Sequence, residues 1–287
     1  MIDLSVSIVN YNSATHLQKC LSSLMRHTKD ISCELFVVDN ASIDGSTEML
    51  NRNFPQVKLL KNEENLFFTR AHNQVLKQVQ GRYCVLLNPD TYFEENVFKK
   101  CVSFMDEHPE IGVLGPKILN PNGTFQGSGD RFPTFLYGLF ELLLLHTLWP
   151  SNPVRSYRIQ KGWQRNSSQS VDSVSGAFFL VRSSLLSKVG LLDENFLMYW
   201  EEVDWCKRIA KAGHKIFFLS ETSIVHIGSQ SADLLGRSKK EKIFYESLLV
   251  YYGKYYGNKV AFLFNILLKI YTIPALRVLR FLKNFQV

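Results

Sequence analysis

The sequence has few cysteines and no CxxC pair, which removes the usual signature of a redox or zinc-binding protein. The five cysteines are scattered along 287 residues. Three of them (Cys33, Cys84 and Cys206) lie inside apolar or periodic segments. Thiols placed in this way predict reduced, mostly structural cysteines in a cytoplasmic protein.

A leader sequence and a membrane-spanning run are also missing. The apolar start at residues 2–9 is interrupted by Asp3 and by serines, so we expect no signal peptide. We identify no apolar run of transmembrane length. The glycosylation-type motifs at Asn122 and Asn166 therefore carry little meaning in this chain.

Several nucleotide-binding signatures are absent. No GxGxxG follows the first predicted strand, which disfavours an NAD-dependent dehydrogenase. No glycine-rich loop with a lysine lies near the N-terminus, which disfavours a nucleotidyltransferase. The net charge of +7 suits anionic partners such as nucleotide phosphates or anionic lipid. No motif supports nucleic-acid binding, and we expect none.

What is present predicts an α/β protein with an appendage. The chain is 46% hydrophobic and 21% charged, and it is long enough to bury a substantial core. Five apolar strands alternate with helices up to about residue 115, which is the rhythm of a doubly wound parallel sheet. We expect these strands at residues 4–9, 34–38, 57–60, 83–87 and 111–114.

The rhythm stops at about residue 116 and returns at 171. The intervening stretch contains an almost wholly apolar segment at 135–149. We then expect a strand over 172–182, a helix over 201–212 and two short strands at 215–219 and 223–227. Gly176 lies in the first of these strands, where a glycine suggests that the backbone passes close to another group. Amphipathic helices follow from residue 239.

The segment around Asp90 is the strongest candidate for a site. The apolar strand 83–87 is followed at once by Asn88, Pro89 and Asp90, and a proline cannot join a sheet ladder. Asp90 therefore lies at the carboxyl edge of the sheet, where α/β folds bind ligands. We expect it to face a divalent cation that faces a nucleotide diphosphate. The alternative is a simple turn in which Asp90 is a solvated cap.

Two other strand ends should converge on the same edge. Tyr11 and Asn12 follow the first strand, and Asp39 follows the second. The carboxylate can accept hydrogen bonds from a ribose or a base, and the tyrosine can stack on the base. An Asx turn or a helix cap is the alternative for Asp39. Arg70 and Asn73 lie near a helix N-terminus, which favours anions, although Arg70 can also be an ordinary exposed arginine.

A second acidic cluster begins the helix at 201. Glu201 and Glu202 are about 100° apart on a helix, so one can face the crevice while the other holds the scaffold. Asp204 has a partner in Arg208 at i+4. Flanking aromatic side chains would raise a carboxylate pKa by desolvation, which suits a general base. The alternative is an acidic helix start that meets the helix dipole.

His226 follows an apolar strand, and a lone histidine there is more often structural. One aspartate and one histidine are too few for a closed metal cage. They suffice if substrate phosphates and water complete an octahedral shell around Mg²⁺ or Mn²⁺.

Six motifs occur in a specific order, and together they resemble a known family. They are VSIVNYN (6–12), VVDNAS (37–42), NLFF (65–68), LLNPDT (86–91), FLMYWEEVDWC (196–206) and VH (225–226). Over residues 4–230 this set resembles the family 2 glycosyltransferases of the GT-A fold. It is most similar to bacterial rhamnosyltransferases of O-antigen and cell-wall polysaccharide assembly.

The resemblance implies residue roles. In that family the equivalent of Asp39 binds the nucleoside, Asp90 and His226 lie at the metal and diphosphate, and Glu202 is the base. The chain departs from the family at Phe67, where a glycine is usual, and at Glu201-Glu202, where Glu-Asp is usual. The expected catalytic residues are Glu202, Glu201 and Asp204; the donor-binding residues Tyr11, Asn12, Asp39, Asn65, Arg70, Asn73, Asn88 and Asp90; the metal ligands Asp90 and His226; and the acceptor-binding residues Gly176 and Trp200.

The resemblance also implies an architecture. It predicts a GT-A domain over residues 1–235, with a doubly wound, Rossmann-like mixed sheet and helices on both faces. Its nucleotide-sugar half covers about 1–115 and its acceptor half about 116–235. Amphipathic helices over 236–287 would form a C-terminal extension.

The implied activity is inverting, metal-dependent transfer of a sugar, with dTDP-rhamnose favoured over UDP- or GDP-sugars. The acceptor would be a hydroxyl of a polyprenyl-diphosphate-linked glycan at the inner face of the cell membrane. Segments 135–149 and 260–285 would lie on that membrane peripherally. Alternatively they pack on the catalytic domain or form a homodimer interface. The rival functions are a non-catalytic sugar-nucleotide-binding protein and a nucleotidyltransferase.

Overall fold

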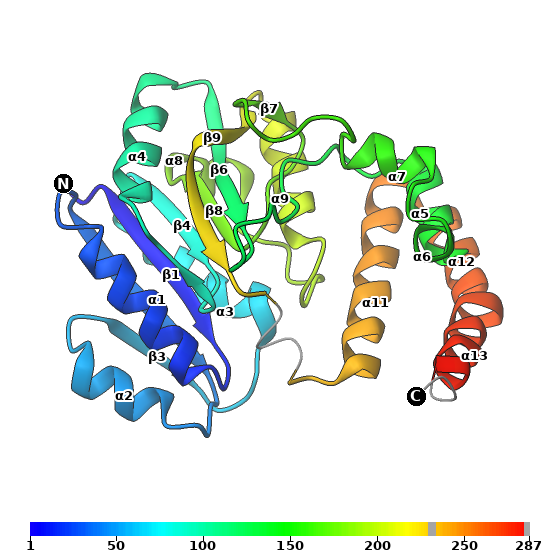
Figure 1. Cartoon of the computed structure of the whole chain (residues 1–287), viewed down its shortest axis with the longest axis horizontal. Coiled ribbons are helices and arrows are strands. Elements are labelled where there is room, and N and C mark those ends of the chain that lie inside the picture. The colour runs from blue at the N-terminus through cyan, green and yellow to red at the C-terminus, as the bar shows by residue number, and fades with distance from the viewer. Residues whose placement is uncertain (229–233, 284–287) are drawn as a thin grey trace.

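The computed structural model describes residues 1–228 and 234–283 (Figure 1). One mixed sheet runs through the molecule in the order β3-β2-β1-β4-β8-β6-β9-β5, and β7 pairs with β9. The strands are β1 (Leu4–Asn10), β2 (Cys33–Asn40), β3 (Lys58–Asn62), β4 (Tyr83–Leu87), β5 (Thr91–Tyr92), β6 (Ile111–Leu119), β7 (Gln169–Val171), β8 (Phe178–Arg182) and β9 (Lys215–His226).

Helices cover both faces of this sheet and then gather at one side of it (Figure 1). The helices over the sheet are α1 (Ala14–Arg26), α2 (Ser46–Asn53), α3 (Phe67–Leu76), α4 (Val97–Glu107), α8 (Ser184–Val189) and α9 (Glu201–Lys211). Those at its side are α5 (Phe135–Leu142), α6 (Leu145–Leu148), α7 (Pro153–Arg158), α11 (Arg237–Tyr256), α12 (Asn258–Leu267), the π-helical turn η1 (Leu268–Thr272) and α13 (Ile273–Lys283).

The expected fold class is confirmed. Strands β3, β2, β1 and β4 are all parallel, so their carboxyl ends lie at one edge. Strand β8 runs antiparallel to both β4 and β6, which makes the sheet mixed. The alternation of strand and helix predicts the parallel half because each parallel connection needs a crossover helix. The strand expected over residues 172–182 contains β8, but the alternation cannot predict its antiparallel direction, because an antiparallel insertion leaves no such rhythm.

Several strand boundaries differ from the expected ones around a proline. Strand β6 continues past residue 114 to Leu119, and β9 is one strand where two were expected. Pro116 would normally end a central strand because it has no N–H to donate. Here the pairing of β6 with β9 shifts register between Pro116 and Lys117, and this bulge accommodates the proline.

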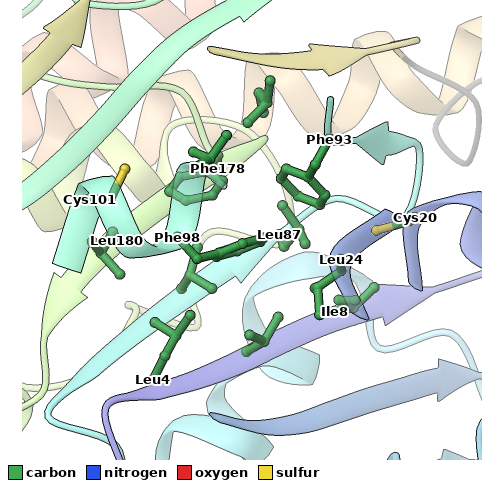
Figure 2. Packing of buried hydrophobic residues seen from close by; sticks show 14 of the residues in the cluster. Leu4, Ile8, Cys20, Leu24, Leu87, Phe93, Phe98, Cys101, Phe178 and Leu180 are labelled. Carbon is green, nitrogen blue, oxygen red and sulfur yellow. The ribbon is translucent and has the colours of Figure 1, made fainter. Parts of the chain in front are cut away.

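The main core lies between the sheet and helices α1 and α4. Ile8 of β1 pairs with Leu87 of β4, Leu4 lies toward the other end of β1, and Figure 2 shows Phe178 above all three. Alternate residues of β2 point to the other face, where Phe36 and Val38 pack against α3. Burial on both faces holds the strands rigidly, so their carboxyl ends form a fixed platform.

The five cysteines are free thiols, as expected, and four of them are buried. Burial raises the pKa of the Cys20 thiol to about 12, which favours an unreactive side chain.

The C-terminal helices share a core with the sheet domain. Leu142 of α5, Trp200, and Leu248 and Tyr252 of α11 lie in one buried cluster. Gly138 lies so close to the Tyr252 ring that a Cβ at this position would approach Cζ to 2.4 Å. The first part of segment 135–149 therefore packs on the extension. The expected domain boundary at 235 stays a prediction.

One helix is longer and more apolar than we expected from the sequence. The stretch Asn258–Leu279 is 22 residues long, and its most apolar window has a mean hydropathy of 1.6 and is only 17% buried. By length and composition it could cross a membrane. The expectation that no run reaches this length is wrong. In the sequence this stretch looks like separate amphipathic helices, because η1 and Pro274 interrupt the regular helical repeat.

Candidate active site

A cavity of about 280 Å³ opens at the carboxyl edge of the parallel strands. It is lined by residues that follow β1, β2 and β4, by the starts of α3 and α9, and by the end of β9. Among the expected site residues, the following line it: Tyr11, Asn65, Asn88, Asp90, Gly176, Glu201, Glu202 and His226.

Asp90 and His226 are brought together by a short antiparallel pairing. Thr91 of β5 pairs with His226 of β9, and Gly228 N donates to Asp90 Oδ2 at 3.1 Å. His226 Nε2 then lies 3.2 Å from Asp90 Oδ1 and 3.1 Å from Asn88 Nδ2. Both Asp90 and His226 are at most 9% exposed. Strand β5 was not expected, yet it is the element that fixes this contact.

The proton on His226 can be assigned from Gln126. The Gln126 amide nitrogen donates to Asn120 Oδ1 and to the His226 carbonyl, so its Oε1 faces His226 Nδ1 as an acceptor. Nδ1 must therefore carry a proton. In the neutral ring Nε2 then has a lone pair, and that lone pair faces the Asp90 carboxylate as well as Asn88.

This arrangement fits a cation that is completed by a substrate. Two acceptor atoms that face each other at 3.2 Å repel unless a proton or a metal ion lies between them. A histidine held through its other nitrogen is the usual second-shell arrangement of a metal ligand. Among residues 1–228 and 234–283, however, no group of three or more His, Cys, Asp or Glu side chains gathers at one point. Any ion held here would need oxygen ligands from phosphate and water.

The first turn of α9 brings both glutamates to the cavity. Tyr199 and Trp200 precede it with φ angles of +68° and +71°, and this left-handed turn aims the helix start at the site. Glu201 and Glu202 both line the cavity. The angle between them on the helix allowed one to face the scaffold, but both border the cavity. Their Oε2 atoms have no hydrogen-bond partner among the described residues.

Burial raises the pKa of both carboxyl groups. For Glu201 the desolvation is reinforced by the charge of Glu202, and the pKa lies well above its usual value. For Glu202 desolvation again dominates, while the Arg158 guanidinium opposes part of the rise. A pair of acids whose environments differ in this way can divide the roles of proton donor and proton acceptor.

Asp204 and Trp200 do not line the cavity. Asp204 is fully buried, and its carboxylate contacts Arg208 Nε at 2.8 Å, Lys254 Nζ at 2.7 Å and the Tyr255 hydroxyl at 2.7 Å. The predicted pair with Arg208 is confirmed, and the carboxylate also ties α9 to α11. Trp200 is buried against Tyr251 in the C-terminal cluster. The contacts of Asp204 and Trp200 therefore hold the start of α9 against α11.

Asp39 lies outside the cavity lining and is hydrogen-bonded to neighbouring residues of the protein. It is 2% exposed, and it accepts hydrogen bonds from Asn10 Nδ2 at 2.8 Å and from Ser42 N at 2.9 Å. The Asx-turn alternative therefore describes its contacts. The next residue, Asn40, lines the cavity instead, and its side chain donates to Asn65 Oδ1 and to the Phe67 carbonyl. Strand alternation contained this signal, because successive side chains point to opposite faces.

Three other expected donor-binding residues also lie outside the cavity lining. Asn73 is 3% exposed and clamps the Leu192 backbone through both its amide oxygen and its amide nitrogen. Arg70 is half-exposed and lies 3.8 Å from Glu194. Asn12 Oδ1 accepts a hydrogen bond from Ile43 N. The helix-terminus argument placed Arg70 and Asn73 near the right edge, but it did not fix the direction of their side chains.

Backbone strain gathers around the cavity. Non-glycine residues with positive φ include Asn12, Ala41, Phe67, Tyr199 and Trp200, all of which line or flank it. Phe67 has a φ of +59°, and its N–H donates to Asn65 Oδ1 at 2.9 Å. Such conformations persist where the surrounding structure enforces them, which is common at functional sites.

Comparison with known proteins agrees with this site. The model of glycosyl transferase family 2 matches residues 5–190. An N-acetylglucosaminyl-diphospho-decaprenol L-rhamnosyltransferase of Mycobacterium tuberculosis is 28% identical over 78% of this chain and 75% of its own length. The O-antigen biosynthesis protein RfbC of Myxococcus xanthus is 24% identical over 75% of this chain and 16% of its own length.

Solved structures share the fold. GalNAc-T7, solved with UDP, GalNAc and Mn²⁺, has a TM-score of 0.61 at 16% identity, and covers 79% of this chain and 43% of that chain. Residues 1–349 of TarS from S. aureus give a TM-score of 0.54 at 18% identity, covering 90% of this chain and 74% of that chain. The fold is therefore that of GT-A glycosyltransferases. Because the family model spans more than half of the sequence, this chain belongs to glycosyl transferase family 2 and is a glycosyltransferase.

Proposed function

We propose that this enzyme moves a sugar, rhamnose in the first place, from a nucleotide-sugar donor to a hydroxyl of a polyprenyl-diphosphate-linked glycan. One observation carries the proposal. Asp90 and Glu202 come from distant parts of the chain, yet they line one cavity at the edge where α/β sheets bind ligands. The substrate class is supported by the name of the mycobacterial relative.

The donor end of the cavity is the Asp90 and His226 pair. Mg²⁺ or Mn²⁺ bound there would neutralise negative charge on the departing diphosphate. The chain itself supplies the Asp90 carboxylate, the Nε2 lone pair of His226 and the Asn88 amide, with Nε2 within hydrogen-bonding reach of the other two. The His226 tautomer is held by Gln126. Asn40 and Asn65, which are joined by a hydrogen bond, offer polar contacts for the nucleoside.

The acceptor end of the cavity is the glutamate pair. Glu202 takes the proton from the acceptor hydroxyl as its oxygen attacks the anomeric carbon, and the bond from that carbon to the diphosphate breaks on the opposite face. The anomeric centre is inverted, as in a one-step inverting glycosidase. Burial and the charge of Glu202 raise the pKa of Glu201, which favours its protonated form, and a protonated carboxyl group can donate a hydrogen bond to the sugar. Arg158 helps Glu202 to stay ionised.

Three substitutions test these roles. Glu202→Gln should keep donor binding and lose about 10²- to 10⁴-fold in turnover, which is the usual contribution of a general base. Glu201→Gln, its matched control, keeps a hydrogen-bond donor and should lose less. Asp90→Ala should remove the enhancement by Mn²⁺ of nucleoside-diphosphate binding, measured by calorimetry. Near wild-type transfer by Glu202→Gln would show that another residue is the base.

We further propose that the enzyme lies peripherally on the inner face of the cell membrane. Exposed apolar side chains follow one another along α12 and α13, including Phe262, Ile266, Ile270 and Phe281. Lys259, Lys269 and Arg277 lie among them. This mixture is typical of an interfacial helix that meets anionic lipid. The side chains of Arg280 and Lys283, and residue 285, lie outside the described residues.

A further inference from the structure

A second hollow adjoins the catalytic cavity. Its volume is about 630 Å³, which lies within the range of small-molecule pockets. Tyr199 lines both hollows. Because Tyr199 and Trp200 form a left-handed turn just before Glu201, the tyrosine forms part of the wall between the second hollow and the glutamate pair.

This second hollow is a groove with one charged wall and one apolar wall. Helix α11 contributes Arg237 and Lys240, together with Glu241, which pairs with Arg237 at 2.9 Å. Helix α11 begins with the residues RSKKEK, in which cations outnumber the single acid, and the positive end of the helix dipole lies here too. The facing wall is apolar, and its leucines are Leu144, Leu148, Leu276 and Leu279.

One further carboxyl group borders the groove. Glu141 of α5 lines it, and burial raises the pKa of this side chain, against the opposing charges of Arg155 and Arg158. Burial disfavours the charged form of Glu141 relative to a carboxyl group in water, and the two arginines offset part of its negative charge. On the α11 side of the groove, Arg237, Lys240 and the positive end of the helix dipole favour an anion.

The apolar wall continues out of the groove. Helix α13 borders the groove through Leu276 and Leu279, while Val278 on the same helix is 57% exposed. Upstream, Phe262 is 65% and Ile270 is 70% exposed. A long apolar chain that leaves the groove can therefore contact further exposed apolar side chains of α12, η1 and α13. The whole surface matches an amphiphile with an anionic head and an extended hydrocarbon tail.

We propose that the groove between α6, α11 and α13 binds the lipid-diphosphate end of the acceptor. The diphosphate contacts the α11 cations, and the first isoprene units lie along the leucines of α6 and α13. The glycan then reaches past Tyr199 to Glu202. This inference rests on the proposed function, since that supplies an acceptor linked to a polyprenyl diphosphate.

The direct test is binding of farnesyl diphosphate to the full chain, measured by titration calorimetry. Lys240→Gln and Leu148→Asp should each weaken binding about tenfold, because each removes one half of the recognition. The matched controls are Lys242→Gln, whose side chain is 73% exposed on the same helix, and Leu136→Asp, at an exposed leucine of α5 outside the groove. These controls should bind as wild type does. Farnesol and inorganic diphosphate should both bind more weakly.

Two results would overturn the assignment. If Lys240→Gln and Leu148→Asp bind farnesyl diphosphate as tightly as the controls do, the groove is not the site. If a nucleoside diphosphate displaces the probe, the probe occupies the catalytic cavity instead. Binding alone decides this point, whether or not the proposed activity is found.

Activity separates the groove from the proposed function. With free N-acetylglucosamine as acceptor, Lys240→Gln and Leu148→Asp should transfer rhamnose at the wild-type rate. With a farnesyl-diphosphate-linked N-acetylglucosamine they should lose about tenfold in kcat/KM. If the wild-type enzyme transfers to neither acceptor, the proposed function fails. If the variants use the lipid-linked acceptor as well as wild type does, the groove proposal fails.

Discussion

Phe67 adopts an unfavourable backbone conformation at the edge of the cavity. Its φ of +59° is unfavourable for any side chain, yet its ring lines the cavity, and Lys239 lies 5.4 Å from the ring centroid. A left-handed residue with a Cβ costs about 1–2 kcal/mol, a cost that glycine avoids. We interpret the phenylalanine as a contact surface for the donor.

Replacing Phe67 by glycine and by alanine separates these two effects. Both variants lose the ring and should raise the donor KM to a similar extent. Only glycine relieves the strain, so Phe67→Gly should unfold with a free energy about 1 kcal/mol higher than Phe67→Ala. Urea denaturation measures the difference. An alanine variant as stable as the glycine variant would show that the loop relaxes and that no strain is stored.

The glutamate pair predicts a pH dependence of stability. The pKa of Glu201 is raised on folding, so the folded state holds its proton over a pH range in which the unfolded state has lost it. This contribution to stability is complete below the unfolded pKa and is lost as the pH rises through the folded pKa. Glu201→Gln should therefore stabilise the protein more at pH 8 than at pH 5.

Thermal unfolding at the two pH values measures this effect. The control is Glu64→Gln, at an exposed position, which should change stability equally at both. An equal effect of Glu201→Gln at pH 5 and pH 8 would mean that the carboxyl group titrates normally.

At the scale of elements, the contact between α9 and α11 depends on Asp204. Its buried carboxylate contacts Arg208 and Lys254, so its removal takes the acidic partner from Arg208 and one of two acidic partners from Lys254. Loss of one member of a buried ion pair costs about 3–5 kcal/mol. Asp204→Ala should therefore lower the free energy of unfolding by about that amount, as measured in urea.

A nearby acid serves as the control for Asp204. Asp193 also contacts Lys254, at 2.5 Å, but its side chain is 19% exposed, so Asp193→Ala should cost clearly less. If the folded Asp204→Ala enzyme is stable but has no turnover, the carboxylate has the catalytic role that its contacts do not suggest.

The apolar face of α12 and α13 is the second element-scale feature. The double variant Phe262→Asp and Ile270→Asp places two charges on side chains that are at least 65% exposed, so folding should be little affected. Sedimentation with anionic liposomes should fall several-fold relative to wild type. Ile43→Asp changes an isoleucine that is 92% exposed in the loop before α2, and it should sediment as wild type does. Equal sedimentation of all three proteins would contradict membrane binding by this face.

At the scale of the whole molecule, the sequence predicts the features that are determined by a local pattern of residues. The strand from Tyr83 to Leu87 was placed correctly because an apolar run ended by Pro89 allows little else. The convergence of Asp90, Glu202 and His226 on one cavity was also predicted, since strand ends share an edge and the motifs resemble those of one family.

Features that depend on distant contacts escaped prediction. Asp39 and Asn73 lie outside the cavity lining, because their side chains form buried hydrogen bonds with Asn10, Ser42 and Leu192. Strand β5 exists only because β9 lies beside it, and two residues have no periodicity of their own. The groove beside α11 is formed by segments around residues 141, 199, 240 and 276, and no short pattern links them.

The place of β9 in the sheet bears on how this protein can be shortened. The family match ends at residue 190, but β9 lies between β6 and β5 and carries His226. A fragment cut at 190 would leave the long edge of β6 bare, and such an edge invites pairing between copies. During synthesis this edge of β6 stays unpaired until residues 215–226, which form β9, have left the ribosome. Until then the nascent chain has Asp90 without His226 beside it, so the pair that we propose as the donor site forms only late in synthesis.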